Sequence, residues 1–441
     1  MSVRIDGRAI DRLLVVGFAR TGRAVVDFAL DRGLAAFVSE GGRLSDEDRD
    51  SLRARGVRFE DGGHTIDFLA DVDPDAVVVS PAVPADAPLL RAAAARGIPV
   101  HSEIDLASAA VECPIIAVTG TNGKSSTVTA IGAILRDLGL RVEVAGNIGI
   151  PFVSVVDRAA TCDAVVVEVS SFQLEQSDTF HPRVGVLLNL APDHLDRHGS
   201  MAAYAAAKAR LFRRMTPADT AVLPGPLAGE VATGVARVVF FDSIPIDLPA
   251  GADRLARHEV ENVRAALAAC AALVPGFDSS AVPLAVVTPA LALPFRTEPV
   301  GAVGGVRVIN DSKATNPHST IAALDAVGPL DAPIVLLLGG HSKSHGYEAL
   351  PEAIAGRDVR RVVLFGEAGP TLARLFDPAA FDVTVAADLA AAVDVGLRSA
   401  EPGDVLLFSP ACSSYDEFRD YEERGRAFRR LVEAHPGFSP A

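Results

Sequence analysis

The stretch VTGTNGKSSTVTAIG, residues 118–132, predicts a glycine loop between a strand and a helix. A β-branched run at 115–119 leads into the glycines, and Lys124 with two serines opens the helix. Backbone N–H groups of such a loop and the N-terminus of its helix face anions, so the pattern is typical of phosphate binding. Because Val118 stands where a full Walker A motif has its first glycine, the match is to the shorter GTNGKS form. Kinases, motors, GTPase switches and ligases all carry such loops, so the reaction stays open.

Strands and helices alternate over the rest of the chain as well. Apolar runs such as RLLVVG, DAVVVEV, IVLLLGG and DVLLF are each followed by a polar loop or an amphipathic segment. Continuous apolar strands of this kind predict parallel sheets with helices on both faces, and their sites gather at the carboxyl ends of the strands. We expect an α/β protein of three domains: an N-terminal Rossmann-like domain (1–104), a central P-loop-type mononucleotide-binding domain (105–293) and a C-terminal Rossmann-like domain (294–441).

The composition excludes several classes of protein. At 441 residues the chain is too long for a single core, and its net charge of −15 argues against a nucleic-acid partner. No apolar run approaches the roughly 20 residues that span a bilayer, and the N-terminus carries no signal-like segment. The four cysteines are scattered, with no CxxC spacing that would indicate zinc or a disulfide framework. We therefore expect a cytoplasmic protein without membrane insertion.

A second glycine turn lies near the N-terminus, in VVGFARTG at residues 15–22. It is similar to a dinucleotide fingerprint, but Ala19 replaces the middle glycine. An acidic residue that binds a ribose should end the next strand, and AAFVSEGG offers Ser39 and Glu40 at that place. This degraded fingerprint is weak evidence for NAD, and the diphosphate of another nucleotide remains an alternative.

Two polar residues in the middle of the chain suggest a cation site. Glu168 follows four apolar residues at a predicted strand end, where an ionised carboxylate needs a partner. His194 ends another predicted strand, and a serine of the glycine loop adds a hydroxyl. Singly, each is more often a hydrogen-bonded loop residue, but together they favour Mg²⁺, which takes a few protein oxygens plus phosphate and water. Lys208, in an Ala-rich helix, is by its sequence alone a solvated lysine.

In the last third, two long polar loops leave buried strands, INDSKATNPHST (309–320) and FSPACSSYDEFRDYEERGRAF (408–428). Loops of this kind often carry nucleotide or substrate contacts. Arg296 and Lys343 are isolated cations beside loops, and either could neutralise a carboxylate or a phosphate.

Taken in order, GTNGKS, NIGIPF, SSFQLE, DHLDRH, YAAAKARLF, NDSKATNP and SPACSSYDEFRDYEERGRAF resemble the Mur ligases of peptidoglycan synthesis, over nearly the whole chain. The resemblance implies an ATP-dependent ligase that adds D-glutamate to UDP-N-acetylmuramoyl-L-alanine through an acyl phosphate. It also implies a monomer, and two Mg²⁺ ions of which one is bridged by a carbamylated Lys208. Another Mur-type ligase with a different amino acid, such as L-glutamate, and a nucleotide-dependent switch protein without ligase activity remain alternatives.

The resemblance also assigns roles to residues. Its catalytic and metal positions are Lys124, Ser125, Glu168, His194 and Lys208. Its ATP positions are Gly120, Thr121, Asn122, Gly123, Lys124, Ser125, Ser126, Asn262, Arg296 and Asp311. Its substrate positions are Gly17, Arg20, Thr21, Asn147, Ser170, Gln173, His194, Thr315, Lys343, Ser414 and Tyr421. The chain departs from the family in four places. Phe295 stands where His is common, Glu259 replaces an Asn of HNxxN, VSEGG replaces the usual uracil-side loop, and GGHSKSHG differs from the family around Lys343.

Overall fold

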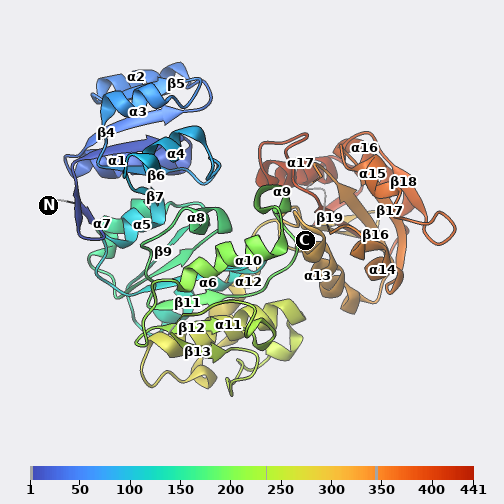
Figure 1. Ribbon diagram of the computed structural model, residues 1–441. Coiled ribbons are helices and arrows are strands. Elements are labelled where there is room, and N and C mark those ends of the chain that lie inside the picture. The colour runs from blue at the N-terminus through green and yellow to red at the C-terminus, as the bar shows by residue number, and fades with distance from the viewer. Residues whose placement is uncertain (1–2, 235, 343–345) are drawn as a thin grey trace. The chain divides into compact units, whose positions relative to one another are not determined.

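The computed structural model describes residues 3–234, 236–342 and 346–441 (Figure 1). Within these residues the strands form three larger sheets and one two-stranded ribbon. The three sheets confirm the expected α/β fold class. Contacts divide the chain into two compact units, one of Met1–Asn189, Ala202–Ala250 and Glu261–Val287, the other of Leu190–Met201, Gly251–Val260 and Thr288–Ala441. No helix in the described part of the chain combines the length and the apolar character needed to cross a bilayer.

The N-terminal sheet has five parallel strands in the order β5-β4-β3-β6-β7. Its strands are β3 (Arg12–Val16), β4 (Ala35–Glu40), β5 (Arg58–Asp61), β6 (Ala76–Val79) and β7 (Val100–Ser102). Its helices are α1 (Arg20–Asp31), α2 (Asp46–Ala54), α3 (Ile66–Val72), α4 (Pro88–Ala95) and α5 (Glu103–Ser108). The middle strand β3 buries four of its five residues, as an apolar parallel strand should.

The central sheet has six parallel strands in the order β13-β12-β11-β8-β10-β9. They are β8 (Ile115–Thr119), β9 (Val142–Gly146), β10 (Ala164–Glu168), β11 (Val184–Leu187), β12 (Thr220–Leu223) and β13 (Arg237–Phe240). The helical segments of this region are α6 (Lys124–Asp137), η1 (Phe152–Val155), α7 (Val156–Ala159), α8 (Ser171–Glu175), α9 (Leu195–His198), α10 (Met201–Ala209), η2 (Arg210–Phe212), η3 (Gly225–Leu227), η4 (Ala252–Arg254), α11 (Arg257–Leu273), η5 (Ser279–Ala281) and α12 (Leu284–Leu291). Glu168 pairs with Val118 of β8 and Gly146 of β9, so the carboxyl ends of these strands meet.

The C-terminal sheet has seven strands in the order β18-β17-β16-β19-β15-β14-β20. They are β14 (Glu298–Val303), β15 (Val306–Asn310), β16 (Ile334–Gly339), β17 (Val359–Phe365), β18 (Val383–Val385), β19 (Val405–Ala411) and β20 (Phe438–Pro440). The accompanying helices are α13 (Pro317–Val327), η6 (Gly328–Leu330), α14 (Ala349–Ala355), α15 (Gly369–Ala373), α16 (Leu389–Ser399) and α17 (Tyr421–Glu433).

Alternation along β16 gives this C-terminal sheet two cores. Leu336 and Leu338 pack with α13 and α14, whereas Val335 and Leu337 pack with α16 and α17. Successive residues of a strand point to opposite faces, so an uninterrupted apolar strand predicts helices on both sides. Figure 1 shows α13 and α14 on one side of this sheet and α16 and α17 on the other.

Three antiparallel pairings were not expected from the alternating pattern. Strands β1 (Val3–Ile5) and β2 (Arg8–Ile10) form the ribbon, and β14 pairs antiparallel with both β15 and β20. The β14–β15 turn is formed by Gly304 and Gly305, both with positive φ (57° and 88°). A two-residue glycine turn is a known hairpin signal, so this pairing was readable from the sequence.

A glycine at the end of β9 leads to a testable prediction. Gly146 has φ of +99°, and a Cβ there would lie 2.2 Å from the carbonyl oxygen of Glu168. We expect Gly146→Ala to lower the free energy of unfolding by about 3 kcal/mol, from backbone strain plus the clash. Gly139 is the control, since it has φ of +82° but open space around its Cβ position. Gly139→Ala should lose about 1–2 kcal/mol in urea unfolding, and equal losses in the two variants would contradict the clash.

Candidate active site

The glycine loop is braced by a residue that follows the neighbouring strand. Gly120 and Gly123 both have positive φ, and Gly123 caps the N-terminus of α6. Asn189, just after β11, accepts the Thr121 N–H on its carbonyl at 3.1 Å. Its side chain accepts the Asn122 N–H at 2.9 Å and donates to the Asn122 carbonyl at 3.2 Å. These bonds fix the shape of the loop, because the pairing of β11 with β8 brings Asn189 next to it. Asn189 was missed by the sequence analysis.

Two lysines converge on one carbonyl of this loop. The Lys124 Nζ donates to the carbonyls of Gly120 and Thr121, each at 2.9 Å. The Lys208 Nζ donates to the same Gly120 carbonyl at 2.8 Å and lies 4.6 Å from the centre of the Tyr204 ring. The interpretation of Lys208 as a solvated lysine is wrong, because the residue is only 1% exposed. Two ammonium groups beside a helix N-terminus make this edge suitable for a polyphosphate.

Glu168 offers a free oxygen at the same edge of the sheet. Its Oε1 accepts a hydrogen bond from the Asn147 side chain at 3.0 Å, whereas its buried Oε2 has no hydrogen-bond partner. A buried carboxylate oxygen without a partner is costly, and a divalent cation would satisfy it. The buried hydroxyl of Ser125 is a second oxygen donor at the start of α6. The residues present therefore fit Mg²⁺.

The described residues 3–234, 236–342 and 346–441 contain no cluster of three or more His, Cys, Asp or Glu side chains that could hold a metal ion. A divalent cation near Glu168 would therefore take most of its ligands from phosphate and water, as Mg²⁺ commonly does.

Asn262, on α11, lies directly against the glycine loop. A Cβ on Gly123 would come within 2.2 Å of the Asn262 Oδ1, so only glycine fits there. The same Oδ1 accepts a hydrogen bond from the Thr127 hydroxyl at 3.5 Å. The structure thus brings this expected ATP residue to the phosphate loop, although more than a hundred residues separate them in sequence.

The N-terminal glycine turn leads into α1. Gly17 has φ of +90°, and Arg20 and Thr21 form the first turn of the helix. Glu40 is engaged by the turn itself, because its carboxylate accepts a backbone N–H of residue 18 at 2.6 Å. The Arg20 guanidinium donates to the carbonyl of Gly149 at 3.3 Å. The N-terminal turn and the Asn147 segment are therefore neighbours, and both carry residues that are expected to bind the same substrate.

Ser170 and Gln173 form a capping box at the start of α8. The Gln173 N–H donates to the Ser170 hydroxyl at 3.2 Å, and the Ser170 N–H donates to the Gln173 Oε1 at 3.0 Å. Such a box fixes both side chains and the entry of the helix. The two expected substrate residues therefore fix each other's position at the start of α8.

In the second unit, Arg296 lies between two strained residues. Phe295 and Thr297 have φ of +61° and +43°, unusual values for residues other than glycine. The Thr297 N–H donates to one oxygen of Asp311 at 3.1 Å, and the Ser409 hydroxyl donates to the other at 2.7 Å. Burial raises the pKa of Asp311 to about 7, while these hydrogen bonds and the charge of Arg296 oppose the rise. The structure therefore brings the expected ATP residues Arg296 and Asp311 together.

His194 is positioned by a carboxylate next to it in the sequence. It has φ of +54°, and its backbone N–H donates to the Asp193 Oδ1 at 2.9 Å. The other Asp193 oxygen accepts from the Asn316 amide at 3.1 Å. Thr315, His194 and Tyr347 line one small pocket here. Asp193 and Asn316 were missed by the sequence analysis, although both lie inside quoted motifs.

The remaining expected substrate residues lie near the start of α17. Ser414 is buried, and Tyr421 is the first residue of the helix. The Lys313 Nζ lies 3.6 Å from the centre of the Tyr421 ring, a cation–π distance. Lys343, also expected here, lies outside the described residues.

A buried arginine ties these loops together. Arg424 is fully buried, and its guanidinium donates to the carbonyls of Ser413 at 3.0 Å and Ser312 at 2.9 Å. Burial lowers the pKa of Arg424 to about 10. Because it bonds both the loop of Ser312 and the loop of Ser413, Arg424 fixes these two polar loops next to each other.

The fold and the phosphate loop define an α/β enzyme that binds a nucleotide phosphate. The sequence matches three family descriptions in order: "Mur ligase MurD-like, N-terminal domain" over 11–102, "Mur ligase middle domain" over 118–229 and "Mur ligase, glutamate ligase domain" over 295–412. The chain belongs to the Mur ligase family, as the sequence motifs predict.

Curated relatives match along nearly the full length. The UDP-N-acetylmuramoylalanine–D-glutamate ligase of Geobacter metallireducens is 41% identical over 463 residues, which cover 98% of each chain. The ligase of the same name from Pelotomaculum thermopropionicum is 39% identical over 450 residues, covering 96% of this chain and 97% of the relative.

Solved structures share the fold. The MurF ligase of Thermotoga maritima in complex with ADP has a TM-score of 0.59 at 17% identity, covering 96% of this chain and 95% of that one. The folylpolyglutamate synthase/dihydrofolate synthase of Yersinia pestis, complexed with AMPPNP and a Mn ion, has a TM-score of 0.52 at 17% identity, covering 75% of this chain and 91% of that one.

The raised pKa of Asp311 predicts a pH-dependent stability. The folded chain holds this proton up to about pH 7, whereas the ordinary value is 3.8. The folded state therefore binds more protons between these values, and its stability from this group falls as the pH rises through that window. Asp311→Asn removes the ionisation. The free energy of unfolding of the variant, relative to that of the wild type, should therefore rise by up to about 4 kcal/mol between pH 4 and pH 8.

Urea unfolding of both proteins at pH 4 and pH 8 measures this gain. The control is Asp278→Asn, because Asp278 is exposed and its hydrogen bond from Ser280 lowers its pKa. A difference between Asp311→Asn and the wild type that stays constant with pH would contradict the raised value.

Proposed function

We propose that this chain joins D-glutamate to UDP-N-acetylmuramoyl-L-alanine in an ATP-dependent reaction, through an acyl phosphate, in cytoplasmic peptidoglycan precursor synthesis. The near-full-length relatives that carry this activity in their names support the substrate assignment. The single structural observation that carries the proposal is the edge of the central sheet, where Lys124 and Lys208 share the Gly120 carbonyl. The unpartnered oxygen of Glu168 belongs to the same site.

In the first step, a carboxylate oxygen of the alanyl group attacks the γ-phosphorus of ATP and ADP leaves. The work of the protein is positioning and charge neutralisation rather than acid–base chemistry. The loop N–H groups of Gly120 to Ser126 bind the phosphates, and Lys124 turns from the loop carbonyls to their oxygens. Asn262, Arg296 and Asp311 bind the rest of the nucleotide. Ser125, Glu168, His194 and Lys208 would hold Mg²⁺, which would supply positive charge beside the phosphate oxygens.

In the second step, the unprotonated amine of D-glutamate attacks the acyl carbonyl. The carbon–nitrogen bond forms, the carbon–oxygen bond to phosphate breaks, and inorganic phosphate leaves with the electron pair. The amine proton passes to solvent or to the departing phosphate. Thr315, Lys343, Ser414 and Tyr421 hold the glutamate.

The UDP-sugar occupies the other side of the proposed reaction. Gly17, Arg20 and Thr21 bind its diphosphate at the N-terminus of α1, and Asn147, Ser170, Gln173 and His194 bind its muramoyl-alanine part. The hydrogen bond between Arg20 and the carbonyl of Gly149 supports this grouping, because it joins the two segments.

The domain boundaries 1–104, 105–293 and 294–441 belong to the same proposal, as does a monomeric enzyme. Each of the three family matches, over 11–102, 118–229 and 295–412, lies inside one of these ranges. Each domain would supply one group of ligands: the UDP-sugar, the ATP phosphates, and the amino acid with the adenosine.

Omitting one substrate at a time tests the reaction. Purified protein with Mg-ATP, UDP-N-acetylmuramoyl-L-alanine and D-glutamate should release phosphate and form a new amide, and omission of any component should stop both. Phosphate release without an amino acid would instead support a nucleotide-dependent switch. Amide formation with L-glutamate or diaminopimelate, and none with D-glutamate, would support a Mur-type ligase of another specificity.

Lys208 provides a sharper test of the metal site. We propose that its amine adds to CO₂ and loses a proton, giving a carbamate that would hold Mg²⁺. Lys208→Ala should lower kcat by at least about 100-fold, and added acetate or formate should restore part of it by supplying the missing carboxylate. Lys124→Ala is the matched control, because it also removes a lysine from the loop, yet a small carboxylate should not restore its activity. Full activity of Lys208→Ala without additive would contradict the carbamate.

A further inference from the structure

Helix α5 carries two carboxylates that point into the central domain region. Glu103 and Asp105 are both fully buried. Charged residues are almost never fully buried unless they are paired. The partners of these two acids lie on segments next to expected substrate residues, and neither acid has a role in the proposed chemistry.

Glu103 connects two substrate segments. Its Oε1 accepts the Val153 N–H at 2.6 Å, and Val153 lies in η1, which follows the loop of Asn147. The Gln173 side chain also interacts with this carboxyl. The Gln173 Oε1 already accepts from Ser170, so the amide nitrogen of Gln173 is the group left to face Glu103.

The environment of Glu103 favours the neutral acid. Burial raises its pKa to about 7, the hydrogen bonds from Val153 and Gln173 oppose the rise, and the nearby charge of Asp105 adds to it. Its Oε2 is buried without a hydrogen-bond partner. An ionised carboxylate in this place would be costly, so Glu103 contacts the two segments as a neutral acid.

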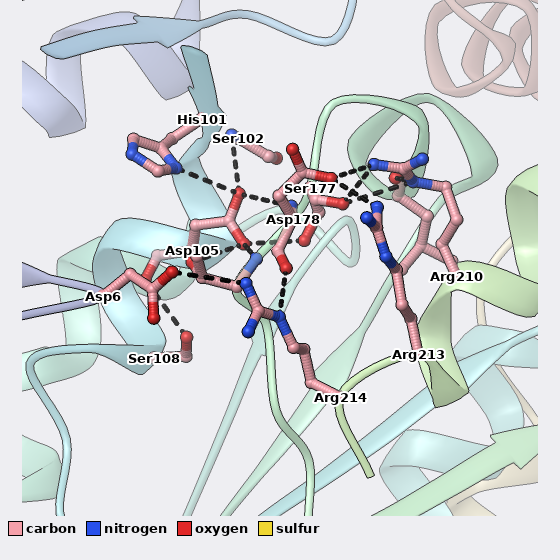
Figure 2. A network of polar contacts seen from close by, with 12 residues as sticks. Asp6, His101, Ser102, Asp105, Ser108, Ser177, Asp178, Arg210, Arg213 and Arg214 are labelled. Atoms are coloured by element: carbon pink, nitrogen blue, oxygen red, sulfur yellow. Dashed lines mark hydrogen bonds and ion pairs between the residues drawn. The ribbon is translucent and has the colours of Figure 1, made fainter. Parts of the chain in front are cut away.

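Asp105 binds the loop that follows α8, and Figure 2 shows its contact with Ser177 of that loop. It accepts hydrogen bonds from the Ser177 hydroxyl at 2.7 Å and from the N–H and hydroxyl of Thr179 at 2.9 and 3.0 Å. It also accepts the Ser102 N–H at 3.0 Å, which fixes the start of its own helix. The loop that leaves α8 is therefore anchored to α5.

Arg210, which follows Lys208 closely in the sequence, also binds the end of α8 and the loop after it. Its guanidinium donates to the carbonyls of Leu174 at 2.8 Å and Ser177 at 2.6 Å. Arg210 lies two residues after Lys208, and Figure 2 shows it reaching the Ser177–Asp178 loop. A five-residue helix such as α8 has little stability of its own, so these outside bonds decide where it lies.

We propose that Glu103 is a positioning residue for the UDP-sugar: it fixes the Asn147–Val153 segment against Gln173, while Asp105 anchors the far end of α8. The inference rests on the proposed function, since it assigns the substrate side of the same site. Loss of Glu103 should weaken binding of the UDP-sugar and leave the nucleotide phosphate loop unaffected.

Binding measurements on the full chain test this. Calorimetry gives the Kd for UDP-N-acetylmuramoyl-L-alanine and, separately, for ADP. Glu103→Ala should weaken UDP-sugar binding at least tenfold and change the ADP Kd less than twofold. Glu103→Gln should stay within threefold for both ligands, because its amide oxygen can still accept the Val153 N–H. In turnover, Glu103→Ala should raise KM for the UDP-sugar far more than it lowers kcat.

Asp219 provides a matched control at the amino end of β12. It is also a buried carboxylate, bonded to His181 at 2.8 Å and to the Thr216 N–H at 2.7 Å. Asp219→Ala should lower Tm without changing the Kd of either ligand by more than twofold. If Glu103→Ala does not fold, Glu103→Asp replaces it, since the shorter side chain keeps the carboxyl group but cannot reach Val153.

The outcomes separate the two proposals. Wild-type affinity for the UDP-sugar in Glu103→Ala or Glu103→Asp would overturn the positioning role. Equal weakening of both ligands in the Glu103 and Asp219 variants would also overturn it, because it would show only a general loss of stability. A wild-type chain that binds ADP but not the UDP-sugar would refute the proposed function itself.

Discussion

Parallel pairing of three central strands is the constraint on which the candidate site depends. β8 pairs with β10 on one side and with β11 on the other, so their carboxyl ends share one edge. That register places the glycine loop beside Glu168 and Asn189. Asn189 shapes the loop and Glu168 presents a free oxygen next to it. Sites form at this edge of parallel sheets because all the strands deliver their following loops to it.

The charge of the site is local rather than global. The chain carries a net charge of −15, yet Lys124 and Lys208 meet on one carbonyl at the start of a helix. At short range, the Lys124 cation and a set of aligned N–H groups outweigh a diffuse negative surface. An acidic protein can therefore bind a polyphosphate without a basic face, which is consistent with a small-molecule substrate rather than a nucleic acid.

Most of the fold could be predicted from the sequence, and the exceptions have identifiable causes. Continuous apolar strands between helices predict the parallel sheets that the structure contains. The sequence Gly304-Gly305 indicates the hairpin turn between the antiparallel strands β14 and β15. The sequence analysis missed this turn because it followed the alternation of strands and helices that predicts parallel sheets. The ribbon of β1 and β2 is made of three-residue strands, which are too short for any periodicity to show.

The sequence by itself determined the phosphate loop, the parallel sheets and the family, because these depend on short-range spacing and on the order of motifs. Only the tertiary structure decided that Lys208 is buried on the Gly120 carbonyl, and that Asn189 and Glu103 brace loops far from them in sequence. An Ala-rich helix gives no local signal for which face is covered. Burial and long-range hydrogen bonds depend on which distant segments pack together, and that is settled only when the sheets assemble.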